Sequence, residues 1–191
     1  MVIKLIKYPN NIVKEKKEKA DYKTYSNRGL TLEDDLNNTN LYYLEKDIAV
    51  VYKKPTPIQI VSKINNKITE AFFKSPSTTD YNGLYRGKYI DFEAKETKSL
   101  TSFPISNIHK HQIIHLENVL HHEGICFLII RFTKLNETYI LLANDFLSFV
   151  NNNNRKSIPY SYFKEKAYLI KDKIKPRVDY ISILEKYGGI K

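Results

Sequence analysis

A short hairpin that leads into an alternating strand is the feature of this sequence that most restricts how the chain can fold. Residues 89–95 read Tyr-Ile-Asp-Phe-Glu-Ala-Lys, and this alternation of apolar and charged residues predicts a half-buried strand. Residues 81–85 predict a shorter strand before it, and Arg86-Gly87 supplies the positive-φ residue that a tight turn needs. The hairpin would therefore return Asp80 to the side of Glu93.

The charged residues of the alternating strand suit a nuclease site. Asp91, Glu93 and Lys95 share one face because side chains alternate along a strand. With Asp80 beside them, carboxylate oxygens could hold Mg²⁺ or Mn²⁺, and a lysine could stabilise the charge that develops on a phosphate during hydrolysis. An exposed hairpin with a surface ladder of ion pairs explains the same pattern, and the residues alone leave both interpretations open.

Several longer sequence motifs resemble those of a known family. They are Lys53-Lys54-Pro55-Thr56-Pro57, Thr78-Thr79-Asp80-Tyr81-Asn82-Gly83, the ten residues from Tyr89 to Lys98, and Thr101-Ser102-Phe103-Pro104. In this order they resemble the RecU Holliday junction resolvases, homodimeric enzymes of the PD-(D/E)xK nuclease superfamily, over residues 27–187. The superfamily's usual proline before the first aspartate is Thr79 here.

The resemblance implies the parts of an active site. By similarity, Asp80 and Glu93 are expected to bind Mg²⁺, for which Mn²⁺ would substitute, and Lys95 is expected to stabilise the transition state. Water activated by the metal would attack in line and leave 5′-phosphate and 3′-hydroxyl ends.

Three further site residues are expected from the same resemblance. Thr78 would be a metal ligand or would orient the site. Gln112 lies within the apolar stripe of a predicted helix, where its amide could reach the metal or simply bond to the backbone. Glu33, beside the buried stripe of the first predicted helix, resembles a glutamate that this superfamily contributes to the metal site, although such a residue is most often solvated.

The predicted fold is α/β with a restriction-endonuclease-like core, in which helices flank a central mixed sheet. Thr31 and Asp34 have capping-box spacing and begin a helix whose stripe contains Leu32, Leu36 and Tyr43. The other expected elements are a strand at 48–52 buried on both faces, a helix at 106–121, a central strand at 124–132, a partner strand at 139–143 and a final helix at 177–187.

Residues 56–77 do not fit this core and are expected to form an insertion. Their apolar residues are interleaved with lysines, and the resembled family has at this place a stalk that enters the centre of a four-way junction. The expected DNA contacts are Arg28, Lys63, Lys67, Phe72, Phe73 and Lys74. The alternative is that both phenylalanines belong to the core or to a dimer contact.

Composition agrees with a nucleic-acid partner. The 191 residues carry a formal net charge of +10, which suits a polyanion. We expect residues 1–25 to be a flexible basic arm and residues 26–191 to be one nuclease domain. No apolar run approaches the ~20 residues of a spanning helix, so we expect no membrane partner and a cytoplasmic protein. Cys126 is the only cysteine and is expected to be an inert buried thiol.

Taken with the resemblance, these features predict a Mg²⁺-dependent, structure-selective endonuclease. As a symmetric homodimer it would make paired nicks in four-way DNA junctions during recombination and repair, alongside a recombinase. Two alternatives are a sequence-specific duplex endonuclease of the same superfamily and a non-catalytic DNA-binding or annealing protein. Zinc is a further alternative for His111 and His115, one helical turn apart, but no other ligand is suitably placed nearby.

Overall fold

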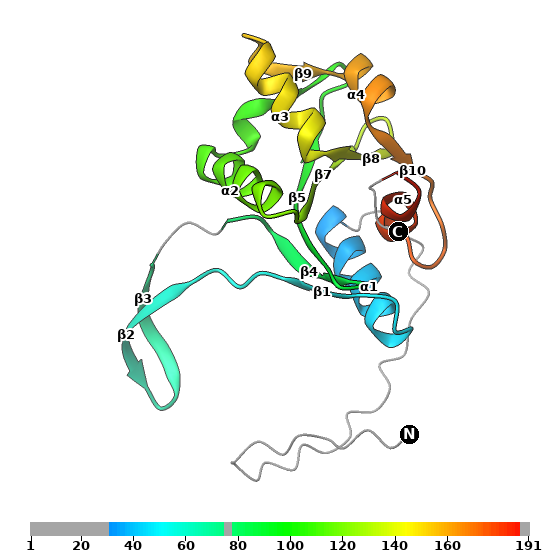
Figure 1. Ribbon diagram of the computed structural model, residues 1–191. Coiled ribbons are helices and arrows are strands. Elements are labelled where there is room, and N and C mark those ends of the chain that lie inside the picture. Colours follow the sequence, from blue (N-terminus) through cyan, green and yellow to red (C-terminus); the bar gives the residue numbers. More distant parts are fainter. Residues whose placement is uncertain (1–30, 75–77, 188–191) are drawn as a thin grey trace.

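A mixed six-stranded sheet forms the centre of the computed structural model, which describes residues 31–74 and 78–187 (Figure 1). The strand order is β1-β4-β5-β7-β8-β10, with β5 and β7 parallel and the other neighbours antiparallel. The strands are β1 (Val50–Lys53), β4 (Tyr81–Tyr85), β5 (Lys88–Thr97), β7 (Ile125–Phe132), β8 (Glu137–Leu142) and β10 (Tyr168–Ile170). The expected arm at 1–25 and Arg28 lie outside the described residues.

The hairpin between β4 and β5 forms as predicted. Arg86 and Gly87 both have positive φ, at 46° and 76°, which matches the tight turns that join antiparallel strands. Tyr81 lies opposite Phe92. This register places Asp80, the residue before β4, beside Glu93.

Strand β5 is buried on both faces at its centre, so the expectation of a half-buried strand is wrong there. Ile90 and Phe92 pack into one core, while Asp91 and Glu93 on the opposite face are also 0% exposed. The alternative of an exposed ladder of ion pairs is therefore wrong for these two carboxylates.

One face of the sheet is covered by α1 (Leu32–Glu45) and α5 (Tyr180–Tyr187). The capping box of Thr31 and Asp34 forms, and the predicted stripe of Leu32, Leu36 and Tyr43 is buried. The last helix begins at Tyr180 instead of residue 177, yet its apolar residues pack against this face as expected.

The opposite face is covered by α2 (Lys110–His121), α3 (Ala143–Asn152) and α4 (Tyr160–Lys166). Helix α2 begins later than residue 106, because Ile105–Asn107 form a short 3₁₀ turn and His109 is an extended N-cap. A small sheet of β6 (Ser102–Pro104) and β9 (Ser157–Pro159) lies beside these helices. Strand β7 is central and pairs with β8, as predicted, and Cys126 on it is buried.

Strand β1 is an edge strand, which corrects the expectation of a strand buried on both faces. Val51 is 3% exposed and faces α1, whereas Val50 and Tyr52 are 42% and 57% exposed. Only one face of this edge is covered by a helix, so alternate side chains remain in solvent.

The stalk is a separate two-stranded hairpin of β2 (Ile58–Ile64) and β3 (Lys67–Phe73) that projects away from the core (Figure 1). Asn65 and Asn66, both at positive φ, make its turn. Phe72 and Phe73 are 58% and 74% exposed, so the alternative that they belong to the core is wrong. No helix in the described part of the chain is long and apolar enough to cross a membrane.

Candidate active site

A notch in the sheet brings the acidic residues together. Strand β4 begins at Tyr81, whereas β5 continues past Phe92 and there pairs only with β7. Asp80 fills the place of the missing strand partner. Its backbone N–H donates to Glu93 Oε2 at 3.1 Å, and its Oδ2 accepts from the Ala94 backbone N–H at 3.2 Å.

Lys95 places its ammonium group between the two carboxylates. Its Nζ donates to Glu93 Oε1 in an ion pair and lies 3.4 Å from Asp80 Oδ2. The side chain of Glu93 is fully buried, while those of Asp80 and Lys95 are 30% and 28% exposed. One oxygen from β5 and one from the residue before β4 thus converge on one cationic group.

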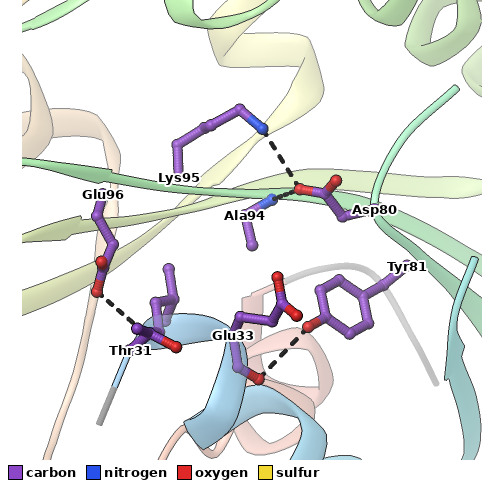
Figure 2. Close-up of a pocket in the computed structure, with 8 residues that line it drawn as sticks. Thr31, Glu33, Asp80, Tyr81, Ala94, Lys95 and Glu96 are labelled. Atoms are coloured by element: carbon purple, nitrogen blue, oxygen red, sulfur yellow. Dashed lines mark hydrogen bonds and ion pairs between the residues drawn. The ribbon is translucent and has the colours of Figure 1, made fainter. Parts of the chain in front are cut away.

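A pocket of about 270 Å³ opens at this notch (Figure 2). Glu33 reaches it from α1 and Lys95 from β5, with Asp80 at its wall (Figure 2). Glu33 is 55% exposed and forms an ion pair with Lys53. The lining residues are Thr31, Leu32, Glu33, Asp80, Tyr81, Ala94, Lys95 and Glu96.

The notch changes the acidity of its charged groups. Burial, together with the nearby charge of Asp80, raises the pKa of Glu93 to about 7, and Lys95 opposes this only partly. Burial alone would lower the pKa of Lys95, but the charges of Glu93 and Asp80 outweigh it and raise that pKa. The lysine therefore stays cationic at neutral pH, while Glu93 is poised between its two forms.

The donor set fits a hard divalent cation. Asp80 and Glu93 supply carboxylate oxygens that already converge on a positive charge, and such oxygens are preferred by Mg²⁺. Within residues 31–74 and 78–187, no group of three or more His, Cys, Asp or Glu side chains forms a metal cluster. A cation held here would need further oxygen ligands, and Mg²⁺ usually keeps several waters.

Comparison with known proteins identifies the family. The family model described as Recombination protein U, RecU, matches residues 27–186. The chain belongs to the RecU family. Proteins named Holliday junction resolvase RecU are 52% identical to it in Oceanobacillus iheyensis, over 88% of this chain and 90% of that protein, and 56% identical in Geobacillus thermodenitrificans, over 85% of each.

Another RecU relative and a solved structure are also similar to this chain. The protein named Holliday junction resolvase RecU in Geobacillus sp. strain WCH70 is 52% identical over 95% of this chain and 97% of its own length. The structure of Hjc, a Holliday junction resolvase from Archaeoglobus fulgidus, superposes with a TM-score of 0.41 and 12% identity, over 70% of this chain and 89% of that one.

Two of the expected RecU site residues make other contacts. Thr78 Oγ1 accepts from Lys54 Nζ at 3.0 Å. Gln112 is 5% exposed, and its Oε1 accepts from the backbone N–H of His109 at 2.8 Å, which is the ordinary solution for a buried amide. Neither residue lines the pocket, so their part in a metal site stays a prediction.

The DNA-binding candidates that the structure describes belong to the stalk. Phe73 lies opposite Ile58, and Phe72 lies opposite Gln59. Successive residues of a strand point to opposite faces, so the two phenylalanines point away from each other. Lys63, Lys67 and Lys74 are also exposed on this segment.

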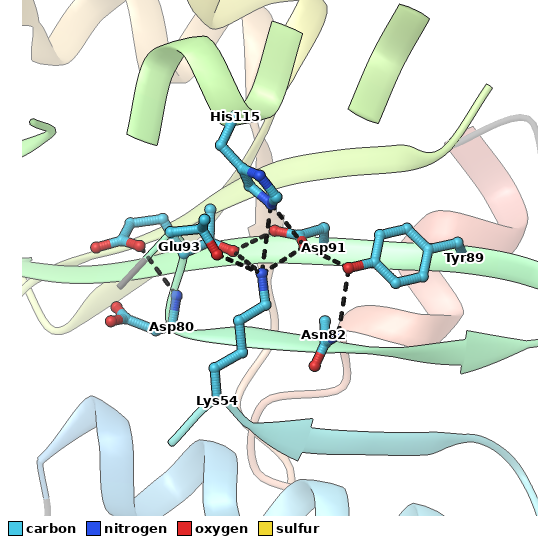
Figure 3. A network of polar contacts seen from close by, with 9 residues as sticks. Lys54, Asp80, Asn82, Tyr89, Asp91, Glu93 and His115 are labelled. Atoms are coloured by element: carbon cyan, nitrogen blue, oxygen red, sulfur yellow. Dashed lines mark hydrogen bonds and ion pairs between the residues drawn. The ribbon is translucent and has the colours of Figure 1, made fainter. Parts of the chain in front are cut away.

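A polar network beside the notch was not predicted from the sequence (Figure 3). Lys54 Nζ forms an ion pair with the buried Asp91 at 2.6 Å, and His115 from α2 lies 3.0 Å from the same carboxylate. The alternation of the strand already predicted that Asp91 lies on the same face of β5 as Glu93. The contacts with Lys54 and His115 join residues far apart in the sequence and had no local signal.

Proposed function

We propose that this protein is a Holliday junction resolvase, a structure-selective endonuclease that cuts four-way DNA junctions. The observation that carries the proposal is that Asp80 and Lys95 line the pocket at the notch and the buried Glu93 pairs with Lys95 directly behind them, in a chain that belongs to the RecU family. The names of its relatives support the same activity.

The proposed enzyme depends on Mg²⁺, with Mn²⁺ as a substitute. Asp80 and Glu93 would hold the cation, because their oxygens are the paired carboxylates of the notch. When bound, the metal would polarise the scissile phosphate and lower the pKa of a bound water. Glu33, which lines the same pocket, is the proposed third carboxylate, and Thr78 and Gln112 are proposed to orient the site.

Lys95 has the electrostatic role in this proposal. Its raised pKa keeps the ammonium charged near neutral pH. Because it pairs with both Asp80 and Glu93, it would lie close to a phosphate bound to a cation that these carboxylates hold. A fixed positive charge at that position stabilises the negative charge that develops during phosphodiester hydrolysis.

The stalk is proposed to give the preference for junctions. We propose that residues 26–191 form one nuclease domain. The stalk is an insertion in this domain, at about residues 56–77, and projects from its core. The exposed Phe72 and Phe73 could stack on unpaired bases at the open centre of a junction, and Lys63, Lys67, Lys74 and Arg28 could contact phosphates.

Paired nicks require two sites, so we propose that the enzyme acts as a homodimer. Val50, Leu84 and Tyr89 form a row across β1, β4 and β5, and each is at least 39% exposed. An exposed apolar row at a sheet edge supports contact with a second copy. A recombinase is a further proposed partner, and work on the chromosome would place the enzyme in the cytoplasm.

Cleavage of defined substrates tests the proposal. The protein is incubated with a synthetic four-way junction, a linear duplex and a single strand, each with Mg²⁺, with Mn²⁺ and with EDTA. Symmetric paired cuts in the junction that require the metal are the expected result. Cuts at a fixed duplex sequence would instead indicate a restriction-type enzyme, and binding without cleavage would indicate a non-catalytic DNA-binding protein.

A further inference from the structure

The ammonium group of Lys54 is enclosed by polar atoms at the root of the stalk (Figure 3). Its Nζ donates to Asp91 Oδ2 at 2.6 Å, to Thr79 Oγ1 at 2.7 Å and to Thr78 Oγ1 at 3.0 Å, and His115 Nε2 lies 3.4 Å away. An ammonium has three N–H donors, and here each has an oxygen acceptor. The side chain is only 14% exposed, so this lysine is a structural cation and not a free surface charge.

Asp91 is the counter-charge that fixes this lysine. Its carboxylate is fully buried and accepts from Tyr89 Oη at 2.8 Å and from the Thr79 hydroxyl, in addition to Lys54. A buried carboxylate is tolerated only when it is paired and hydrogen-bonded. Lys54 and Asp91 therefore hold each other in one geometry.

The two legs of the stalk meet at this ammonium. Lys54 follows the last residue of β1, where the chain leaves for the stalk, and Thr78 and Thr79 lie where it returns to β4. The next residue is Asp80, whose backbone C=O accepts from Lys54 N at 2.8 Å. The same lysine thus contacts the outgoing leg, the returning leg and strand β5.

Among the described residues, neither strand of the stalk contributes to the two buried cores. All seven residues of β3 are exposed, and β2 contributes none to either buried core. An isolated two-stranded hairpin is marginally stable in water. Its direction relative to the sheet must therefore be set where its legs join the core.

We propose that Lys54 is a positioning residue that clamps both legs of the stalk to β5 and thereby holds Asp80 against Glu93. Asp91 lies two residues before Glu93 on the same face of β5, so the clamp and the carboxylate pair share one rigid strand. DNA that engages the stalk would then meet a notch whose acids are already in place. This inference rests on the proposed function for its catalytic consequence, but the clamp itself can be tested without DNA.

Hydrogen–deuterium exchange measures the clamp directly. Lys54→Met removes the ammonium, and Lys54→Met/Asp91→Asn removes both charges in case the single variant leaves Asp91 too costly to bury. Backbone amides of Lys54 and Asp80, bonded to Asp80 O and Glu93 Oε2, should exchange about tenfold faster in these variants, while β7 stays protected. Lys54→Arg, which keeps a cation, should retain most of the protection. Lys88→Met removes an exposed lysine of β5, the strand that carries Asp91, and is the matched control.

Cleavage under single-turnover conditions measures the catalytic consequence. The double variant should cut a junction about 100-fold more slowly, because small displacements of reacting groups have effects of this size. Its junction affinity should stay within about threefold of the parent, whereas a lysine that mainly contacts phosphate would change affinity and its salt dependence. Lys54→Arg should recover most of the rate, and Lys88→Met should stay within about twofold.

Three results would overturn the clamp. They are unchanged exchange at Lys54 and Asp80, exchange that rises equally in β7, and a cleavage rate equal to that of the parent. If the parent itself leaves junctions intact, the proposed function fails, yet the exchange experiment still decides whether Lys54 positions Asp80. The two failures can therefore be distinguished.

Discussion

Glu93 combines two demands that oppose each other. Its carboxylate would have to be ionised to hold the proposed divalent cation, but its side chain is fully buried, and burial disfavours the charged form. Lys95 pairs with it at one oxygen, and the Asp80 backbone N–H donates to the other. These contacts leave a net cost of ionisation that a bound cation would offset.

The pH dependence of stability should reveal this cost in the metal-free protein. The pKa of Glu93 is raised from 4.5 to about 7, so the folded state binds this proton more tightly than the unfolded chain. The free energy of unfolding therefore falls as pH rises between these two values, and the full penalty is present above pH 7. The change that Glu93→Gln causes in the free energy of unfolding should thus be more stabilising at pH ~8 than at pH ~5, by about 1–3 kcal/mol.

Urea unfolding in EDTA at the two pH values measures this difference. Glu117→Gln, at an exposed position of α2, is the matched control. It should change the free energy of unfolding by the same amount at both pH values. An effect of Glu93→Gln that does not change with pH would contradict the assignment of a costly buried charge.

Neutralising either carboxylate should stop cleavage without preventing binding. Asp80→Asn and Glu93→Gln keep the side-chain shapes but remove the charges that would hold the cation. Single-turnover cutting of a junction should fall by about 10³-fold or more, with affinity within about threefold. Glu165→Gln, an exposed acid on α4, should cut normally. A parallel loss of binding and of the folded state would assign both acids a structural role instead.

At the scale of elements, the stalk should contribute shape and not only charge. Replacing residues 62–69 by Asn-Gly shortens the hairpin while keeping the Ile60–Ala71 pair. Junction affinity should fall about tenfold and duplex affinity less than about threefold, because on the proposed binding mode the contacts that are lost would lie at the junction centre. Gel-shift titration of both substrates measures the ratio.

The matched control for the shortened stalk is Lys63→Gln/Lys67→Gln. It removes the charges that the shortening removes but keeps the length of the hairpin. This variant should weaken junction and duplex binding by similar factors. Equal losses on both substrates in the shortened protein as well would show that the stalk acts only through its lysines.

Local patterns in the sequence predicted the elements whose formation depends mainly on residues close together in the chain. The β4–β5 hairpin follows from alternation and a two-residue turn, and the start of α1 follows from the capping box of Thr31 and Asp34. The pairing of Asp80 with Glu93 was predictable for the same reason, because the hairpin register alone brings them together. The resemblance to RecU proteins supplied Glu33 and the stalk, which no local pattern marks as functional.

Features that depend on distant segments could not be predicted in this way. The burial of Asp91 requires Lys54 and a histidine of α2, which the fold brings to it from both directions along the chain. The edge position of β1 depends on strand order and not on its own apolar residues. Gly83 is another case, since a Cβ atom there would lie 2.1 Å from the carbonyl oxygen of Val50, a close approach that exists only after β1 and β4 have paired.

At the scale of the whole molecule, the exposed apolar row should join two copies. Leu84 lies at the centre of the row, 51% exposed, so Leu84→Lys would place a charge within the proposed interface. Sedimentation should show a dimer for the parent and a shift of at least about tenfold in the dissociation constant for the variant. Leu169→Lys, at the other edge of the sheet and 44% exposed, is the control. A dimer that Leu84→Lys leaves unchanged would place the interface elsewhere.

The net charge of +10 should make binding strongly dependent on salt. If about six phosphates are contacted, junction affinity should fall by about 10³-fold between ~50 mM and ~200 mM salt. Lys63→Gln/Lys67→Gln should reduce the slope of log K against log salt by about 2. Titrations by fluorescence anisotropy give both slopes, and an affinity independent of salt would contradict a phosphate-dominated interface.

Because the stalk is separate from both buried cores, its length can change without altering the packing of either core. Adding one residue pair to each strand extends the hairpin by about 6–7 Å and preserves which side chains face each way, since the pleat repeats every two residues. Neither core would need to repack. Related enzymes could thus be adapted to branched DNA of different openness by changing the reach of this one arm, and designed variants could do the same without altering the catalytic acids.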